Sequence, residues 1–254
     1  MSFGDASTAR AGASANERSG APVDRAVLED LAAASRILAD QGVFDAAGHV
    51  SLRHPGRPDR FLMARALAPA LVTADDIMQL DLAGEPCESA ARKPFLERFI
   101  HSEIYRKRPD VMAVVHSHSA SVIPFSLVHT PLRAMFHNAA FLAAGVPVFD
   151  IRTLFGATDL IIGSREKGAA LAETLTDKAV ALLRAHGMVV VGPSLQTAVF
   201  RAVFTEVNAR IQQQAVALGS PIAALDHEEG RLADAVNLAT VDRSWDLWRR
   251  RVLP

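Results

Sequence analysis

Cysteine is almost absent from this sequence, and so are long apolar runs and any excess of basic charge. Cys87 is the single cysteine among 254 residues, so neither an intrachain disulfide nor a cysteine-based metal site can form. Lysine and arginine number 27 against 28 aspartates and glutamates, which is not the basic balance of a nucleic-acid-binding protein. Apolar runs all fall short of the ~18 residues of a membrane span. We therefore expect neither a nucleic acid nor a membrane as a partner.

The first 22 residues are rich in alanine, serine and glycine, and they lack the apolar segment of a secretory signal peptide. This composition is typical of a disordered lead, which we expect to cover residues 1–22. Half of the sequence is hydrophobic and no second linker interrupts it, so residues 23–254 are expected to form a single domain. The scarcity of cysteine and the missing signal peptide favour a cytoplasmic location.

Short apolar runs alternate with segments of helical periodicity, which predicts an α/β or α+β domain. Thr73 and Asp76 have the spacing of a capping box, which predicts one helical turn between two strands. Helices are predicted over residues 24–41, 94–107, 165–175 and 194–218, with a shorter one from about residue 227. Strands are predicted over residues 49–53, 60–64, 77–81, 111–118, 146–151, 179–183 and 188–191.

Three histidines carry the first chemical signal. His116 and His118 are two residues apart at the end of a predicted strand, so both imidazoles can face one metal ion. Alone, this pair is equally compatible with structural, hydrogen-bonded histidines. His186 lies between two further strands and precedes Gly187, which permits an unusual backbone conformation. Three imidazoles with an open fourth position are typical of a catalytic metal site, and as neutral ligands they leave the ion a strong Lewis acid.

A glutamate precedes these histidines on the predicted helix 94–107. Glu97 has apolar neighbours there, and a carboxylate in apolar surroundings beside a metal can act as a general acid/base. The alternative is an exposed helical glutamate. His101 follows one helical turn later and would project from the same face. We interpret His101 as a structural or supporting histidine rather than a catalytic one.

Glu97, Arg108-Pro109-Asp110, the strand that ends at His116-Ser117-His118, and His186-Gly187 together resemble the class II aldolase/adducin family. The resemblance extends over about residues 24–220. It implies an α/β fold, namely a three-layer α/β/α sandwich with a mostly antiparallel central sheet. It also implies that the three histidines bind a divalent metal ion, that Glu97 is the catalytic acid/base, and that the protein is a homotetramer. Mn²⁺ or Zn²⁺ is the expected ion, with Co²⁺ or Fe²⁺ as alternatives.

The sequence departs from this family where its sugar-phosphate aldolases hold the phosphate. Those members use an asparagine in a Gly-Asn-x-Ser segment and two serines before the glutamate, whereas this chain has Gly48-His49-Val50-Ser51 and Phe95-Leu96. Apolar side chains cannot hydrogen-bond a dianion, and burying one without partners would cost roughly several kcal/mol. We therefore predict a substrate that carries no phosphate group.

The residues found instead favour an aromatic or heteroaromatic acid. Arg65 could pair with a carboxylate, and His49 could hydrogen-bond the substrate or move a proton, so His49 is grouped with Glu97 as catalytic. Ser51 and His137 complete the predicted substrate-binding set with Arg65. The alternatives are a surface ion pair for Arg65 and a turn-stabilising role for His49. The expected apolar walls are Met63, Phe95, Leu96 and Phe136.

Residues 44–51, 96–101 and 137–142 are similar to the decarboxylase branch of the family, which acts on hydroxypyridine dicarboxylates and dihydroxyphthalates. The similarity predicts a metal-dependent, non-oxidative carbon–carbon lyase that removes a carboxylate ortho to a ring hydroxyl, in the catabolism of aromatic compounds. Three alternatives stay open. They are aldol cleavage of a non-phosphorylated hydroxy-acid or sugar acid, an Fe(II)-dependent oxidative reaction, and a non-catalytic, adducin-like assembly module, against which the three metal histidines argue.

Overall fold

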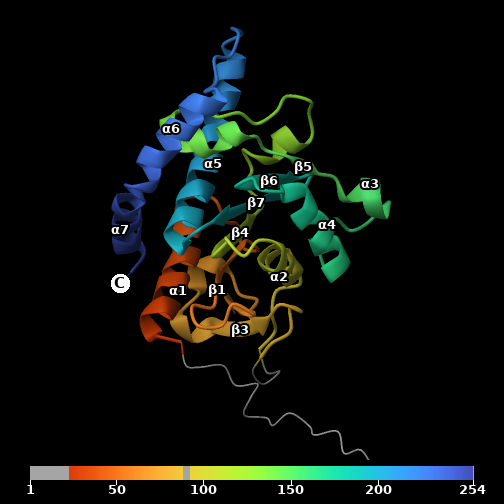
Figure 1. Cartoon of the computed structure of the whole chain (residues 1–254), viewed down its shortest axis with the longest axis vertical. Helices are drawn as coiled ribbons and strands as arrows, with labels where there is room; N and C mark the ends of the chain where they lie inside the picture. The colour runs from red at the N-terminus through yellow and green to blue at the C-terminus, as the bar shows by residue number, and fades with distance from the viewer. Residues whose placement is uncertain (1–22, 88–91, 254) are drawn as a thin grey trace, which may run out of the picture.

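A seven-stranded sheet forms the centre of the computed structural model, which describes residues 23–87 and 92–253 (Figure 1). The strand order is β3-β2-β1-β4-β7-β6-β5, and every neighbouring pair is antiparallel except β5 and β6. The strands are β1 (His49–Arg53), β2 (Arg60–Ala64), β3 (Ile77–Asp81), β4 (Ala113–Ser117), β5 (Val148–Phe149), β6 (Val180–Leu183) and β7 (Gly187–Gly192). The predicted α/β class and the mostly antiparallel sheet are confirmed.

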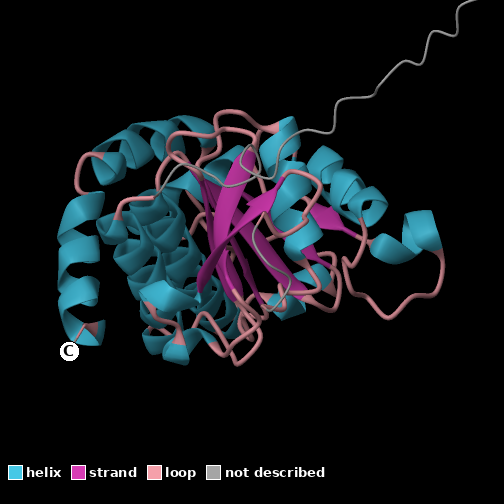
Figure 2. Ribbon diagram, turned by 90° about the horizontal axis from the view of Figure 1, so that it is seen from below, coloured by secondary structure: helices cyan, strands magenta, loops and turns pink. Residues whose placement is uncertain are grey.

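Helices cover both faces of this sheet, which makes the three-layer arrangement (Figure 2). On one face lie α1 (Arg25–Asp40), α5 (Leu195–Ala217) and α7 (Val241–Val252), and on the other lie α2 (Arg98–Lys107) and α4 (Arg165–Leu175). The remaining helices are α3 (Ile151–Phe155), α6 (His227–Leu238) and the 3-10 segments Pro69–Leu71, Ala74–Asp76, Ile123–Ser126 and His137–Ala144.

Strand β4 illustrates how the sequence builds two cores. Its side chains alternate, so Val115 packs with the α1, α5 and α7 side while Val114 packs with the α2 and α4 side. Both faces are buried, which explains why β4 reads as a continuous apolar run rather than an alternating one. Since His116 occupies the next alternate position after Val114, its side chain belongs to the α2 face of the sheet.

Two glycines let elements of the α2 face approach closely. A Cβ on Gly187 would lie 2.0 Å from the carbonyl oxygen of Ser117, so only glycine lets β7 pair with β4 at this position. A Cβ on Gly168 would lie 2.3 Å from the carbonyl oxygen of Phe99, where α4 packs on α2. The first of these approaches brings the segment around His186 against the end of β4.

Strands β1, β2 and β3, helix α4 and the Thr73–Asp76 capping box match their predicted bounds. The start of α2 does not, because the helix begins at Arg98 rather than at residue 94. The carbonyl oxygen of Lys93 accepts a 2.8 Å hydrogen bond from the Ala66 amide, which ties the segment before α2 to the end of β2. Glu97 is therefore the N-cap residue and does not lie within the helix, which corrects the sequence-based prediction.

Strand β5 is shorter than the predicted 146–151 segment, because Asp150 leaves the sheet to cap α3 by accepting a hydrogen bond from the Arg152 amide. The predicted disordered lead, residues 1–22, lies outside the described residues. Within the described part of the chain, every helix is too short or too polar to cross a membrane.

Candidate metal centre

Glu97, His116, His118 and His186 meet at the end of β4. One ligand-type atom from each lies within 4.8 Å of those of the other three. Glu97 Oε2 is 3.4 Å from His116 Nε2 and 3.5 Å from His186 Nε2, and the Nε2 atoms of His118 and His186 are 3.1 Å apart. The structure thus brings the three predicted metal ligands and the predicted acid/base into one group.

His186 reaches this group from a tight turn between β6 and β7. Ala185, just before it, has a φ of 56°, a left-handed conformation that is uncommon for residues other than glycine. The Ala185 amide donates a 3.0 Å hydrogen bond to Ser126 Oγ, which holds the turn from outside the sheet. Strained backbone of this kind is retained where the surrounding structure enforces it, and here it directs His186 toward His118.

The other ring nitrogens of two histidines are fixed by acceptors. His116 Nδ1 donates to the carbonyl oxygen of Met188 at 3.1 Å, and His118 Nδ1 donates to Asp45 Oδ2 at 2.9 Å. With its only proton on Nδ1, each ring would present a lone pair on Nε2 to the centre of the group. Such outer hydrogen bonds commonly set the tautomer of metal-binding histidines. Asp45 was not identified from the sequence, since a loop aspartate 73 positions from its partner has no local signature.

His116 Nε2 tests whether the group fits a metal ion. This nitrogen is buried and has no hydrogen-bond partner among the described residues, and it faces the other three side chains. A buried lone pair without a donor is costly unless a cation or a donor meets it. The donor set, three imidazoles and a carboxylate, is one that Zn²⁺ and similar divalent ions accept. The residues present therefore fit a divalent metal.

Glu97 is held on both sides at this site. Its Oε1 accepts a 2.9 Å hydrogen bond from the amide of Ile162, and its Oε2 faces His116 and His186. Burial alone would raise the pKa of Glu97, but the close contacts with these two histidines outweigh burial and lower it below its usual value. Glu97 is thus an ionised carboxylate that can ligate a cation or accept a proton.

His49 lies beside the group, on the strand next to β4. Its ring centroid is 5.1 Å from that of His116 and 4.6 Å from that of Phe95, and its Nδ1 is 2.7 Å from His101 Nε2. Burial holds the pKa of His49 well below its ordinary value, and the same holds for His101. Both rings are therefore neutral. The assignment of His49 as catalytic stays a prediction.

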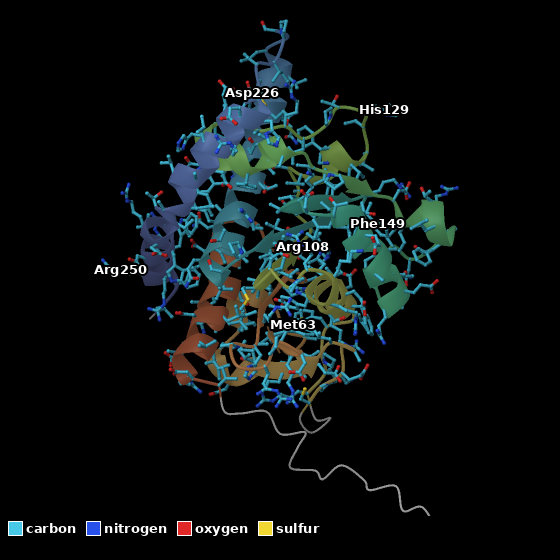
Figure 3. All side chains as sticks on the ribbon, in the orientation of Figure 1. Met63, Arg108, His129, Phe149, Asp226 and Arg250 are labelled. Atoms are coloured by element: carbon cyan, nitrogen blue, oxygen red, sulfur yellow. The ribbon has the colours of Figure 1, made fainter. Side chains whose placement is uncertain are left out.

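Two residues that were expected to contact the substrate lie inside the core. Ser51 is fully buried, and its hydroxyl is 2.7 Å from both His101 Nδ1 and Tyr105 OH, so it cannot touch a substrate unless the core opens. Met63, labelled in Figure 3, is likewise fully buried and packs in the core on the α2 side of the sheet. By contrast, Leu96 is 72% exposed beside Glu97 and can form an apolar wall.

Arg65 and His137 are not in hydrogen-bond contact with the group in the described residues. Arg65 forms a 2.7 Å ion pair with Asp76 and lines a separate pocket with Arg92 and Lys93. His137 is exposed, and its Nδ1 lies 3.4 Å from Oδ1 of the neighbouring Asn138. Substrate binding by either residue stays a prediction.

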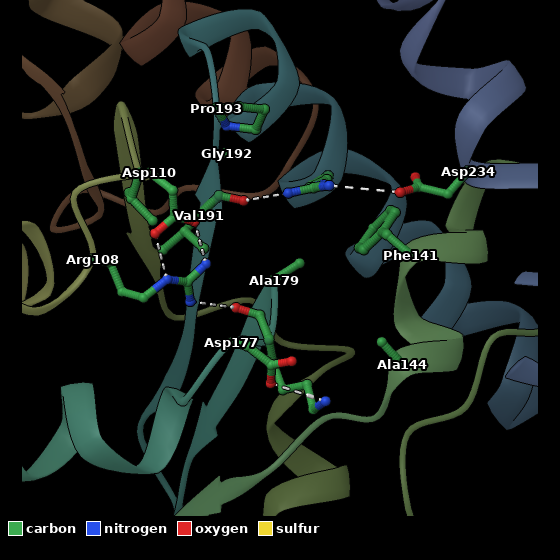
Figure 4. Close-up of a pocket in the computed structure, with 13 residues that line it drawn as sticks. Arg108, Asp110, Phe141, Ala144, Asp177, Ala179, Val191, Gly192, Pro193 and Asp234 are labelled. Atoms are coloured by element: carbon green, nitrogen blue, oxygen red, sulfur yellow. Dashed lines mark hydrogen bonds and ion pairs between the residues drawn. The ribbon is translucent and has the colours of Figure 1, made fainter. Parts of the chain in front are cut away.

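A further hollow of about 330 Å³ lies at the opposite end of β4 and β7 (Figure 4). Charged side chains of opposite sign pair in this hollow. Arg108 forms an ion pair with Asp110 at 2.7 Å, and the Arg201 guanidinium lies 3.7 Å from Asp234. Glu97 and the three histidines do not line it. Its location separates it from the metal centre by the length of a strand.

Comparison with known proteins agrees with this geometry. The model of the Class II Aldolase and Adducin N-terminal domain matches residues 29–213. The chain belongs to this family. It is 37% identical over 239 residues to Decarboxylase tropJ of Talaromyces stipitatus, covering 85% of this chain and 90% of that protein. It is 29% identical over 234 residues to the 3,4-dihydroxyphthalate decarboxylase of Arthrobacter keyseri, with the same two coverages.

A crystal structure of an aldolase II superfamily protein from Pseudomonas syringae has the same fold, with a TM-score of 0.75 at 24% identity over 94% of this chain and 96% of that one. The predicted family and its decarboxylase branch are confirmed by these matches. These matches support a lyase, and the group at the end of β4 could hold a divalent metal ion.

Proposed function

We propose that this protein is a metal-dependent, non-oxidative decarboxylase that removes a carboxylate ortho to a hydroxyl group on an aromatic or heteroaromatic acid. The observation that carries the proposal is the environment of Glu97. The carboxylate lies among three histidines that could bind a metal ion. The adjoining residues are a neutral His49, Phe95 and the exposed Leu96. Such a wall suits an aromatic ring and offers no cation to a phosphate.

His116, His118 and His186 would hold the ion through their Nε2 atoms. When bound, a divalent ion there supplies Lewis-acid stabilisation of the negative charge that develops on a substrate oxygen as a carbon–carbon bond breaks. The hydrogen bonds to Asp45 and Met188 keep the lone pairs of His118 and His116 directed at that position.

Glu97 moves the proton that the reaction requires. Its Oε1 is engaged by the Ile162 amide, so Oε2 is the oxygen free to exchange a proton. It takes the proton of the ring hydroxyl and delivers it to the ring carbon that bears the carboxylate. The resulting β-keto acid loses CO₂, the bonding electrons return to the keto oxygen, and reprotonation of that oxygen restores the phenol. The ionised state of Glu97 in the folded protein suits the first transfer.

The deciding experiment measures CO₂ release from a panel of ortho-hydroxy aromatic dicarboxylates under nitrogen. The protein is reconstituted with Mn²⁺, Zn²⁺, Co²⁺ or Fe²⁺, and a chelator is added to a parallel sample. Release that needs the ion but not oxygen is the expected result. Aldehyde or ketone formation from hydroxy-acids in place of CO₂ would instead assign aldol cleavage, and activity that needs oxygen would assign oxidative chemistry.

A further inference from the structure

A chain of hydrogen-bonded side chains runs from the metal centre into the core between α2 and the sheet. His49 Nδ1 is 2.7 Å from His101 Nε2, and His101 Nδ1 is 2.7 Å from Ser51 Oγ. Ser51 Oγ is in turn 2.7 Å from Tyr105 OH. All four side chains are at most 4% exposed, so their hydrogen bonds are made with one another rather than with bulk water. The only ring nitrogen of His49 outside this chain is Nε2.

Tyr105 gives the chain a direction. Its hydroxyl proton needs an acceptor, because the side chain is buried in the core. Two acceptors are within reach, Ser51 Oγ at 2.7 Å and the carbonyl oxygen of Met112 at 3.4 Å. The Met112 carbonyl already accepts the Arg53 amide at 2.7 Å. The shorter bond to Ser51 is stronger, and the Tyr105 proton therefore lies on the Ser51 side.

The remaining protons follow from this direction. Ser51 accepts from Tyr105, so its own hydroxyl donates to His101 Nδ1. His101 is a neutral ring inside the core, so with Nδ1 accepting it carries its proton on Nε2 and donates it to His49 Nδ1. His49 is also neutral, and with Nδ1 accepting it must carry its own proton on Nε2. Each bond in the chain agrees with the next, and the polar atoms of the four side chains have partners within the chain except His49 Nε2.

We propose that His101, Ser51 and Tyr105 are positioning residues that lock His49 in the neutral tautomer with its proton on Nε2. His49 is then a fixed hydrogen-bond donor to an anionic oxygen of the substrate, a carboxylate or the oxygen of the developing enolate. It is not a base, and with no lone pair on Nε2 it is not a metal ligand, although its ring lies only 5.1 Å from that of His116. The identity of the acceptor rests on the proposed function, but the tautomer does not.

The tautomer is measured directly by magic-angle-spinning ¹⁵N spectroscopy of the zinc-loaded protein labelled only at histidine. His49→Gln identifies the two signals of His49 by their loss. We expect an unprotonated Nδ1 and a protonated Nε2 in the wild-type protein. Tyr105→Phe, which keeps the ring and removes the proton that directs the chain, should produce a mixture of both tautomers. A wild-type signal from a protonated Nδ1 would overturn the proposal whatever the reaction is.

A second test compares the kcat of two variants of His101. His101→Gln keeps an N–H donor facing His49 Nδ1, whereas His101→Leu has a similar volume and no donor. We expect His101→Leu and Tyr105→Phe to lower kcat about ten- to a hundredfold at unchanged metal content, and His101→Gln to restore most of the loss. Equal loss in the Gln and Leu variants would show a purely structural role and contradict the proposal. If the wild-type protein itself releases no CO₂, the proposed function fails while the spectra still decide the tautomer.

Discussion

Two of the three histidines of the metal centre depend on a residue that does not itself belong to the centre. Asp45 directs His118, and the carbonyl oxygen of Met188 directs His116. Glu97 is oriented in the same way by the Ile162 amide. A site of this kind is tuned through its supporting hydrogen bonds as much as through its ligands, because a ring that rotates or changes tautomer no longer presents its lone pair.

Asp45→Asn should therefore weaken metal binding while the fold is retained. Burial raises the pKa of Asp45, but the hydrogen bond from His118 and the amides of Ala47 and Gly48 outweigh it, so the pKa is lowered and the side chain is an anion at neutral pH. The neutral amide is a poorer acceptor and can donate, which frees the tautomer of His118. We expect about a 10- to 100-fold loss of zinc affinity in a competition titration with a chromogenic chelator. Asp40→Asn, an exposed change at the end of α1, is the control and should leave the affinity unaltered.

Glu97→Gln should separate proton transfer from the binding of substrate. The amide keeps the size of the side chain and can still accept from the Ile162 amide, but it cannot take up a proton from the substrate. We expect kcat to fall about 10²- to 10⁴-fold with little change in KM. Metal content, measured by plasma mass spectrometry, shows whether the ion is retained. A metal-loaded variant with wild-type turnover would remove Glu97 from the mechanism.

At the scale of elements, the metal centre depends on how closely β7 approaches β4. The turn that carries His186 ends at Gly187, whose hydrogen atoms face the backbone of Ser117 where any side chain would collide. The left-handed Ala185 and the hydrogen bond to Ser126 complete this turn. The pairing of β7 with β4 therefore also places His186 in the metal centre. A substitution that disturbs this pairing should also weaken metal binding.

Gly187→Ala tests this coupling, since a methyl group would lie 2.0 Å from the Ser117 carbonyl oxygen. We expect the free energy of unfolding to fall by at least about 2 kcal/mol in urea denaturation, and zinc affinity to fall with it. Gly56→Ala is the matched control, because the nearest atom to its methyl group is 3.8 Å away. Its stability should stay within about 0.5 kcal/mol of wild type. Normal stability in Gly187→Ala would show that β7 can move without cost.

Local signals in the sequence predicted most of these elements, and long-range contacts account for what was missed. Alternating and continuous apolar runs located β1, β2 and β3, and the Asp24 cap located the start of α1. The start of α2 was wrong because the tie between Lys93 and Ala66 joins residues 27 positions apart. The ligand types at His116, His118 and His186 were readable, but the partnership of Asp45 and the burial of Ser51 depend on the packed structure.

At the scale of the whole molecule, the metal ion is expected to be part of the stability of the fold. The four side chains of the centre come from the N-cap of α2, the end of β4 and the β6–β7 turn, so the native state should bind the ion far better than the unfolded chain. The homotetramer stays a prediction, since these contacts all lie within one chain.

Removal of the metal should therefore lower the melting temperature. An ion present at 100 times its Kd stabilises the native state by about 2.7 kcal/mol, which corresponds to a rise of about 5–10 °C for a chain of this size. Calorimetry of chelator-treated and zinc-reconstituted protein measures the difference. His116→Ala should abolish it, since that variant loses the buried nitrogen that faces the ion. An equal rise in the variant would indicate that zinc binds elsewhere.

The spacing of the ligands along the chain also has a consequence for how the protein is made. Glu97 and His186 are 89 positions apart, and β4 and the β6–β7 turn must both be in place before all four side chains meet. A nascent chain emerging from the ribosome offers at most Glu97 and the His116–His118 pair until His186 has been synthesised. All four side chains can therefore hold the ion only late in synthesis. Complete metal binding is therefore expected only in chains in which β7 has already paired with β4.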